Sequence, residues 1–466
     1  MIPVTHMRGR NLALFGLGGS GLATAEALVM GGANVLAFDD NPASVRRAHD
    51  AGIQTGDLRD ADWSRMDALV LAPGVPLTHP KPHWSADLAR RNDVPIVGDL
   101  ELFVRERAHV CPEARVIAIT GTNGKSTTTA LVAHVLREGG YDVQMGGNIG
   151  LPVLTLEPFT PFRKPAAGEP GGRVYVVEVS SYQIELAPSL DPDVGVLLNL
   201  SPDHLDRHGT FQRYAAIKER LVAQSRRAVV GIDDDASAAI ATRVRANPVS
   251  IRHDTGGITF DRYPGGRGAL MRDGKVLAEM ADFPALAGPH NAQNALVALA
   301  ATKGFVKTSD TIRAFRTFPG LAHRLERVGT VGDVLFVNDS KATNPDAAAT
   351  ALQSYQRVRW IAGGLPKPGG IADLRPHFGR VTKAYLVGEA APDFAATIGE
   401  TIPYEISGTV EAAVNHALHD AQASDEGGCV VLLSPAAASF DQFRNFEARG
   451  EAFRKAVEGL SGFRPV

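Results

Sequence analysis

Short apolar runs alternate with helical patterns along the first hundred residues of the chain. Apolar runs at residues 12–15 and 34–38 enclose a helical pattern at 21–30, and a further run follows at 67–71. Continuous apolar runs of this length are typical of strands that are buried on both faces of a parallel sheet. The alternation therefore predicts βαβ units and an α/β fold.

The same alternation begins again near residue 115 and near residue 321. In the second stretch we expect a helix at 126–137 and strands at 116–119, 174–179 and 194–198. In the third stretch we expect strands at 335–337, 360–362, 385–387 and 430–433. The pattern predicts three domains, at residues 1–104, 105–320 and 321–466. Residues 157–172 are rich in Pro and Gly and predict a surface loop.

Composition and charge exclude several classes of protein. The chain has 466 residues, of which 44% are hydrophobic and 21% charged, as in an ordinary globular protein. Its formal net charge of −3 at pH 7 gives no electrostatic reason to expect nucleic acid or an anionic membrane as a partner. Cys111 and Cys429 are far apart and indicate neither a disulfide framework nor a zinc site. No run of about 18 apolar residues is present, so we expect no membrane insertion and a cytoplasmic location.

The first motif with a chemical meaning is GLGGSG at residues 16–21. It follows an expected strand, precedes an expected helix, and is followed about twenty residues later by Asp39. Glycines at these positions let the backbone approach a diphosphate at a helix N-terminus. The motif therefore predicts a nucleotide or dinucleotide site, including that of a nicotinamide-dependent dehydrogenase; the alternative is a tight turn that binds nothing.

A second glycine loop, ITGTNGKST at residues 119–127, is similar to a P-loop. Ile119 occupies the position of the first glycine of the full motif, but Gly121 and Gly124 still keep side chains away from a phosphate. Lys125 would bring a positive charge to the β- and γ-phosphates, and Ser126 would offer a hydroxyl to Mg²⁺. The alternative is a Gly-Lys turn that opens a helix.

Four further positions carry groups that either a ligand or the fold could use. Glu178 lies within an apolar strand, where it needs a cation, either Mg²⁺ or a structural salt-bridge partner. His204 follows a strand and is a candidate metal ligand or orienting group. Lys218 lies on a helical stretch, where most lysines are solvated. Asn291 and Asn294 share one helix face and could contact a base or ribose, or cap the helix.

Polar loops follow the expected strands of the last third. They supply His323, Arg324, Asp339, Lys341, Thr343, Asn344, Lys367, Ser434, Ser439, Phe440 and Phe446. Each loop could be ordinary turn chemistry. However, the carboxyl ends of parallel strands are where ligands bind in such sheets. A nucleotide-binding regulator without catalysis would leave Glu178, His204 and Lys218 unexplained.

Taken in order, these stretches resemble the Mur ligase family. The resemblance runs through GLGGSG, GTNGKST, GGNIG, EVSSYQIE, DHLDRH, HNAQNALVA, HRLE, NDSKATNPDA and LLSPAAASFDQF and covers essentially the whole chain. GTNGKS marks the wider superfamily, which includes folylpolyglutamate synthases. NDSKATN and the SP…ASFDQF loop are similar to the branch of the family that adds D-glutamate. Ala437 is a departure, because the family often has a cysteine there.

The resemblance implies an ATP-dependent amide ligase with three domains. It would add D-glutamate to UDP-N-acetylmuramoyl-L-alanine through an acyl phosphate, as a monomer that acts in cytoplasmic peptidoglycan precursor synthesis. The family has a Rossmann-like N-terminal domain that binds the uridine diphosphate rather than a nicotinamide cofactor. Its central domain is a P-loop-type mononucleotide-binding domain, and its C-terminal, Rossmann-like domain binds D-glutamate.

The resemblance also implies a role for each matching residue. The UDP-substrate site would contain Gly19, Ser20, Asp40, Asn41, Ala72, Pro73, Gly74, Asn148 and His204. The ATP site would contain Gly121, Thr122, Asn123, Gly124, Lys125, Ser126, Thr127, Asn291, Asn294, Arg324 and Asp339. The D-glutamate site would contain Thr343, Lys367, Ser439, Phe440 and Phe446. Two Mg²⁺ ions would be held by Ser126, Glu178, His204 and Lys218, the last as a carbamate, and the catalytic residues would be Lys125, Glu178, His204 and Lys218.

Overall fold

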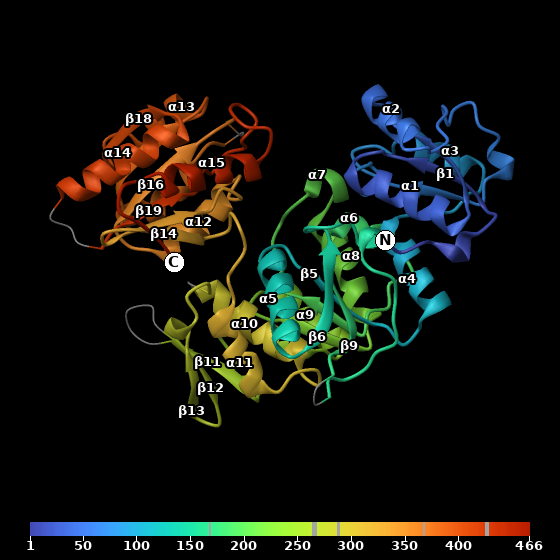
Figure 1. Ribbon diagram of the computed structural model, residues 1–466, viewed down its shortest axis with the longest axis horizontal. Helices are drawn as coiled ribbons and strands as arrows, with labels where there is room; N and C mark the ends of the chain where they lie inside the picture. The colour runs from blue at the N-terminus through green and yellow to red at the C-terminus, as the bar shows by residue number, and fades with distance from the viewer. Residues whose placement is uncertain (167–168, 263–267, 287–288, 367–368, 425–427) are drawn as a thin grey trace. The chain divides into compact units, whose positions relative to one another are not determined.

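The computed structural model of residues 1–466 describes all of them except 167–168, 263–267, 287–288, 367–368 and 425–427 (Figure 1). The chain divides into two compact units. The first unit contains Met1–Asp282 and His290–Phe318, and the second contains Phe283–Pro289 and Pro319–Val466.

The first unit begins with a four-stranded parallel sheet. Its order is β2-β1-β3-β4, with β1 at Asn11–Phe15, β2 at Asn34–Phe38, β3 at Ala68–Leu71 and β4 at Ile96–Val97. The accompanying helices are α1 at Gly19–Gly31, α2 at Pro42–Asp50, α3 at Trp84–Arg91 and α4 at Asp99–Val110. The glycine loop at 16–21 therefore joins β1 to α1, at the carboxyl end of a central strand.

A six-stranded parallel sheet forms the larger part of the first unit. Its order is β10-β9-β8-β5-β7-β6, with β5 at Arg115–Thr120, β6 at Tyr141–Gly147, β7 at Gly171–Glu178, β8 at Val194–Leu197, β9 at Arg227–Gly231 and β10 at Asn247–Val249. The helices between these strands are α5 at Lys125–Glu138, α6 at Ser181–Glu185, α7 at Leu205–His208, α8 at Phe211–Ala223 and α9 at Asp235–Val244. Since β5 is central, the second glycine loop lies at the middle of this sheet's carboxyl edge.

A small antiparallel sheet and two helices complete the first unit. The sheet contains β11 at Ile258–Arg262, β12 at Gly268–Arg272 and β13 at Lys275–Glu279, and the helices are α10 at Pro289–Thr302 and α11 at Thr308–Thr317. Figure 1 shows these strands beside α10 and α11. Helix α11 packs against α5, where His134 Nε2 lies 3.0 Å from the carbonyl oxygen of Ala314.

The second unit is built on a seven-stranded sheet of order β18-β17-β16-β19-β15-β14-β20. The strands are β14 at Glu326–Val331, β15 at Val334–Asn338, β16 at Val358–Gly363, β17 at Val381–Val387, β18 at Tyr404–Gly408, β19 at Val430–Leu433 and β20 at Phe463–Pro465. Strand β14 pairs antiparallel with β15 and with the edge strand β20, and the other neighbouring strands pair in parallel. The main helices are α12 at Pro345–Ser354, α13 at Ala391–Ile398, α14 at Val410–Ala423 and α15 at Phe446–Glu458.

The predicted α/β fold with parallel sheets is confirmed. Strands β2 and β19 have the predicted bounds, and the other predicted strands agree within a few residues. The surface-loop prediction for residues 157–172 is wrong at its end, because Gly171 and Gly172 begin β7. The antiparallel sheet β11–β13 was not predicted, because its strands are short and only partly buried and have no strong apolar run.

One hydrophobic core connects the two parallel sheets of the first unit. The same buried cluster contains Leu14 of β1, Phe103 of α4 and Val116 of β5. The Phe103 ring is fully buried, with its centroid 5.0 Å from that of Phe159 and 5.7 Å from that of Tyr175. Helix α4 therefore joins the N-terminal sheet to the central sheet through packing.

We expect Phe103→Ala to lower the free energy of unfolding of the first unit by about 3–5 kcal/mol, because it leaves a cavity at this junction. The measurement is thermal and denaturant unfolding followed by circular dichroism. Val110→Ala on the same helix is the matched control, since Val110 is 50% exposed. Equal melting temperatures for the two variants would contradict the packing role of Phe103.

Candidate active site

The loop between β5 and α5 is shaped to surround an anion. Gly121 has φ +154° and Gly124 has φ +80°, which are left-handed backbone conformations that favour glycine. A Cβ on Gly124 would lie 2.7 Å from Oδ1 of Asn294. The loop leads into the N-terminus of a 14-residue helix, an arrangement that binds phosphate in other proteins. Within the loop, the backbone N–H groups of Thr122 and Asn123 donate to Asn199.

Lys125 places its ammonium group over this loop. Its Nζ donates hydrogen bonds to the carbonyl oxygens of Gly121, at 2.9 Å, and Thr122, at 2.7 Å. Ser126, the next residue of the helix, is only 2% exposed. The side-chain charge, the loop amides and the hydroxyl are therefore collected at one end of α5.

Glu178 ends the neighbouring strand β7 with an incompletely bonded carboxylate. In the sheet, Glu178 pairs with Ile119 of β5. Its Oε1 accepts a hydrogen bond of 2.8 Å from Nδ2 of Asn148. Its Oε2 is buried and has no hydrogen-bond partner among the residues that the structure describes. A buried carboxylate oxygen without a partner is costly, so this atom fits a position that receives a cation.

The chain does not offer a complete metal cage of its own at this place. Among the described residues, no three His, Cys, Asp or Glu side chains come together as metal ligands. That arrangement suits Mg²⁺, which is commonly bound by one or two carboxylates together with substrate phosphates and water.

Lys218 of α8 lies buried against the same loop. It is 1% exposed, and its Nζ donates hydrogen bonds of 2.9 Å to Oγ1 of Thr120 and to the carbonyl oxygen of Gly121. Burial, followed by the charge of Lys125, lowers the pKa of Lys218 well below its ordinary value, although Asp203 and Glu178 act in the other direction. The interpretation of Lys218 as a solvated helix lysine is therefore wrong.

A group of aromatic and histidine rings borders Lys218. Its Nζ lies 5.1 Å from the ring centroid of Tyr214, whose hydroxyl is 3.0 Å from Oγ1 of Thr122. The His204 side chain is about half exposed, and its Nδ1 lies 3.0 Å from the Tyr182 hydroxyl. The ring centroids of His204 and Tyr214 are 6.5 Å apart. His204 and Lys218 therefore both lie beside the loop at residues 121–124, which we call the phosphate loop.

His208 is a buried member of this group that sequence analysis missed. Its Nε2 lies 2.9 Å from Oγ of Ser181, and its ring is fully buried. Burial, followed by the charge of Arg207, lowers the pKa of His208 to about 4. The ring is thus neutral at neutral pH and adds no positive charge beside Lys218.

Asn291 and Asn294 connect α10 to the phosphate-loop helix. Asn294 Oδ1 accepts a 3.1 Å hydrogen bond from Oγ1 of Thr128, and its Nδ2 donates one of 2.9 Å to Oδ1 of Asn291. Both residues lie inside α10 and are buried. Asn294 therefore lies directly against Gly124 of the glycine loop.

The N-terminal glycine loop is closed by its own Asp39. The Asp39 carboxylate accepts hydrogen bonds from the backbone N–H of Leu17, at 2.6 Å, and of Asn41, at 2.8 Å. A Cβ on Gly21 would lie 1.7 Å from the carbonyl oxygen of Gly16, so this glycine is required for close packing. Asp39 therefore holds the loop, whereas a dinucleotide site would need a carboxylate that reaches the ribose.

The predicted UDP-site residues lie around this loop. Ser20, Ala72 and Pro73 line one small cavity of about 10 Å³. Asp40 pairs with Arg59 and with His83, and the Asn41 side chain accepts from the backbone N–H of Ala43. Gly19 begins α1, and Gly19 and Gly74 are exposed.

The turn at residues 72–74 also contacts the central sheet's helices. The Arg207 guanidinium donates to the carbonyl oxygen of Pro73, at 3.3 Å, and to that of Val75. Arg207 belongs to α7, which begins directly after His204. The loop edges of the two parallel sheets in the first unit are therefore joined beside His204.

In the second unit, Asp339 lies at the carboxyl end of β15. Its Oδ2 accepts a hydrogen bond of 2.8 Å from Oγ of Ser434, which follows the neighbouring strand β19. Its Oδ1 accepts a hydrogen bond of 3.2 Å from the backbone N–H of Leu325. Burial raises the pKa of Asp339 to about 7, because the hydrogen bond from Ser434 and the charge of Arg324 offset only part of the desolvation.

Arg449, which sequence analysis missed, fixes the three loops of this edge. Its buried guanidinium donates to the carbonyl oxygens of Ser340 (2.9 Å), Ala437 (3.0 Å), Ala438 (3.1 Å) and Gly363 (3.3 Å). The loops that follow β15, β16 and β19 are therefore held by one planar cation. Ala437, where the family often has a cysteine, takes part through its backbone alone.

The predicted D-glutamate residues are distributed over these loops. Ser439 is 2% exposed and Phe440 is 69% exposed. The carbonyl oxygen of Phe446 accepts a hydrogen bond of 2.8 Å from Oγ of Ser340. Thr343 lies just before α12 and is half-buried. Lys367 lies outside the described residues.

Comparisons with known proteins show the family to which the chain belongs. The family model of the Mur ligase middle domain matches residues 119–302, and that of the Mur ligase glutamate ligase domain matches 323–437. UDP-N-acetylmuramoylalanine–D-glutamate ligase of Rhizobium meliloti (strain 1021) is 59% identical over 99% of this chain and 99% of its own length. The protein of the same name from Brucella abortus (strain 2308) is 56% identical, with 100% of this chain and 99% of its own covered.

The chain belongs to the Mur ligase family. Solved structures agree at the level of the fold. UDP-N-acetylmuramate-alanine ligase from Thermotoga maritima has a TM-score of 0.57 at 18% identity, with 96% of this chain and 99% of that chain covered. MurF ligase from Thermotoga maritima in complex with ADP also has a TM-score of 0.57, at 17% identity, with 98% and 97% covered. None of the helices described in this Mur ligase is long and apolar enough to cross a lipid bilayer.

We expect the second unit of this Mur ligase to lose stability as the pH rises from 4 to 8. The pKa of Asp339, raised to about 7, means that the folded state retains a proton that the unfolded state releases near pH 4. The contribution of protonated Asp339 to the free energy of unfolding is therefore fully present below pH 4. It is lost as the pH rises through 7. Asp339→Asn keeps the side chain neutral, so it should be more stable than the original protein at pH 8, by at most about 4 kcal/mol.

The measurement is denaturant unfolding of both proteins at several pH values. Asp346→Asn is the control, because Asp346 is an exposed carboxylate in the same unit. Stability curves of Asp339→Asn and the original protein that run parallel from pH 4 to pH 8 would show that Asp339 is ionised throughout.

Proposed function

We propose that this Mur ligase joins D-glutamate to UDP-N-acetylmuramoyl-L-alanine and converts ATP to ADP and phosphate. The relatives that are 56–59% identical over nearly the full chain carry the name of this activity. The structural observation that carries the proposal is the glycine loop with Lys125 above it and two buried groups beside it, Lys218 and the unpartnered Oε2 of Glu178.

The first chemical step is attack of the alanyl carboxylate on the γ-phosphate, which releases ADP and leaves an acyl phosphate. Two anions must approach each other, so this step needs positive charge fixed in advance. Lys125 and the loop amides at residues 121–127 supply that charge to the phosphates. Asn291 and Asn294 hold the loop and contact the nucleotide. Arg324 also contacts ATP, and Asp339 lies near its ribose.

Mg²⁺ fits the residues around the loop. Glu178 has a free carboxylate oxygen, and Ser126, His204 and a carbamate on Lys218 complete the set that would hold two ions. When bound, the ions neutralise the phosphate charge that Lys125 alone cannot balance.

The second step is attack of the D-glutamate amine on the acyl carbon, after which phosphate leaves from a tetrahedral intermediate. The amine must be neutral to attack, while the two carboxylates of D-glutamate need donors. Lys367, Thr343 and Ser439 are the proposed donors, with Phe440 and Phe446 as apolar walls. A site that pairs a buried carboxylate discriminates against acceptors that lack it, because its donors are then left unpaired.

The three functions are assigned to three parts of the chain. Residues 1–104 bind the uridine diphosphate, through Gly19, Ser20, Asp40, Asn41 and the 72–74 turn, with Asn148 and His204 at the muramoyl end. Residues 105–320 bind ATP, and residues 321–466 bind D-glutamate. The proposed enzyme is a cytoplasmic monomer with small-molecule substrates and no nucleic-acid or membrane partner.

ADP release by the purified protein tests the function. We expect it to require UDP-N-acetylmuramoyl-L-alanine, D-glutamate and Mg²⁺ together, and to be unchanged by NAD or NADP. Lys125→Ala should reduce turnover by about a hundredfold to a thousandfold without loss of folding, since one fixed donor of this kind contributes about 3–4 kcal/mol to transition-state stabilisation. Lys275→Ala, at an exposed lysine of β13, is the control.

Substituting the acceptor separates the specific proposal from the general one. D-Glutamate should be used well, and meso-diaminopimelate and D-alanyl-D-alanine poorly. Equal use of these acceptors would refute the D-glutamate assignment and leave only a Mur ligase of another specificity. Full turnover by folded Lys125→Ala would refute the assignment of the phosphate loop to ATP.

Carbamylation of Lys218 is testable apart from turnover. The lowered pKa of Lys218 favours the neutral amine at neutral pH, and a neutral amine adds CO₂ to become an anionic carbamate. We expect a carbamate signal by ¹³C NMR in ¹³CO₂-equilibrated protein, lost in Lys218→Ala. The same variant should be inactive and partly restored by small carboxylic acids that occupy the vacated space. Full activity of the original protein without a carbamate signal would contradict this role.

A further inference from the structure

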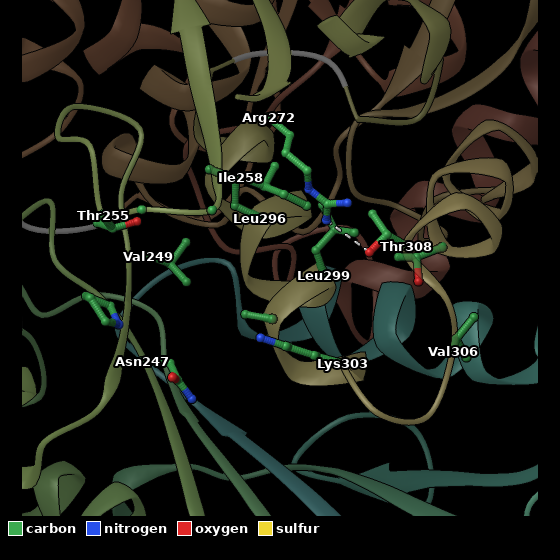
Figure 2. Close-up of a pocket in the computed structure, with 15 residues that line it drawn as sticks. Asn247, Val249, Thr255, Ile258, Arg272, Leu296, Leu299, Lys303, Val306 and Thr308 are labelled. Atoms are coloured by element: carbon green, nitrogen blue, oxygen red, sulfur yellow. Dashed lines mark hydrogen bonds between the residues drawn. The ribbon is translucent and has the colours of Figure 1, made fainter. Parts of the chain in front are cut away.

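A second cavity lies in the first unit, away from the phosphate loop. It has a volume of about 270 Å³ and is bordered by the antiparallel sheet, the C-terminal half of α10 and the start of α11 (Figure 2). Leu296 and Leu299 of α10, Val249 of β10 and Ile258 of β11 form an apolar wall. This volume is close to the lower limit for small-molecule sites in proteins, which is about 300 Å³.

Two positive charges face this wall without an acidic neighbour. Of the 15 residues that line the cavity, the ionisable ones are Arg272 and Lys303, both cationic. Arg272 donates one hydrogen bond of 3.2 Å, to Oγ1 of Thr308. The Lys303 ammonium has no hydrogen bond or ion pair to any residue that the structure describes. In Figure 2 the two cations lie on opposite sides of Leu299.

The apolar wall and the two cations together determine which kind of ligand fits the cavity. A guanidinium has five N–H donors in a planar fork that matches carboxylate or phosphate oxygens, and Arg272 commits one of them to Thr308. An apolar wall beside two unbalanced cations fits an amphipathic anion, with its apolar part against Leu296 and Leu299 and its charge between Arg272 and Lys303.

The cavity is separate from the proposed catalytic site. Its lining contains no residue of the phosphate loop, and neither Glu178 nor Lys218. Both places use α10, but Asn291 and Leu299 are eight residues apart, which corresponds to about 12 Å along a helix. ATP held by the loop would leave this cavity open.

We propose that this cavity is a binding site for a small amphipathic anion, a molecule with one apolar group and one carboxylate or phosphate. The contacts that recognise it are Arg272, Lys303 and Thr308 for the anion and the α10 leucines for the apolar group. The site is independent of the ligase proposal, because its test measures binding and not turnover.

The probe is 8-anilinonaphthalene-1-sulfonate, whose fluorescence rises when its rings enter an apolar site. Titrations use the full chain with saturating ADP and Mg²⁺, so that the phosphate loop is occupied. We expect saturable binding that phenyl phosphate or phenylacetate displaces; the stronger competitor identifies the anion as phosphate or carboxylate. The double variant Arg272→Gln/Lys303→Gln should weaken the binding of the probe at least tenfold.

The matched control is Arg262→Gln/Lys275→Gln, which removes two cations from β11 and β13 that do not line the cavity. It should bind the probe as the original protein does. Circular dichroism verifies that both double variants are folded. Equal loss of affinity in both double variants, no loss in either, or displacement of the probe by neither competitor would overturn the proposal.

Discussion

The burial of charge beside the phosphate loop is the constraint on which the candidate active site depends. Lys218 and Glu178 are both nearly inaccessible to water, and neither forms an ion pair with any residue that the structure describes. Lys218 instead donates to Thr120 and Gly121, and one oxygen of Glu178 has no partner among the described residues. Burial of such groups is costly unless they are hydrogen-bonded or paired with an opposite charge.

The second unit also buries a charged side chain, the guanidinium of Arg449. Arg449 is buried and forms no ion pair with any carboxylate among the described residues, and its guanidinium donates to backbone carbonyl oxygens of three loops and to the Ser340 hydroxyl. The same loops leave Asp339 desolvated, with its pKa near neutrality. Hydrogen bonds from one guanidinium to these backbone carbonyl groups thus fix the positions of the loops.

The two glycine loops of the first unit have similar sequences but different structural roles. At residues 16–21 the glycines allow close packing of the chain on itself, and the Asp39 carboxylate accepts a hydrogen bond from the N–H of one loop residue, Leu17. At residues 121–124 the loop instead collects Lys125, Lys218 and Asn294 around its backbone. The motif alone does not separate these cases, because both place glycines between a strand and a helix.

The sequence by itself determined the parallel α/β fold, the position of ten of the 20 described strands, the phosphate loop and the Mur ligase resemblance. These follow from local apolar runs and from glycines whose backbone conformation is required nearby. Tertiary structure alone decided that Lys218 is buried, that His208 is neutral, that Arg449 joins three loops and that Arg272 and Lys303 share a cavity. The partners concerned are up to about a hundred residues apart in the chain. Desolvation and long-range hydrogen bonding depend on which segments pack together, and no local pattern encodes that information.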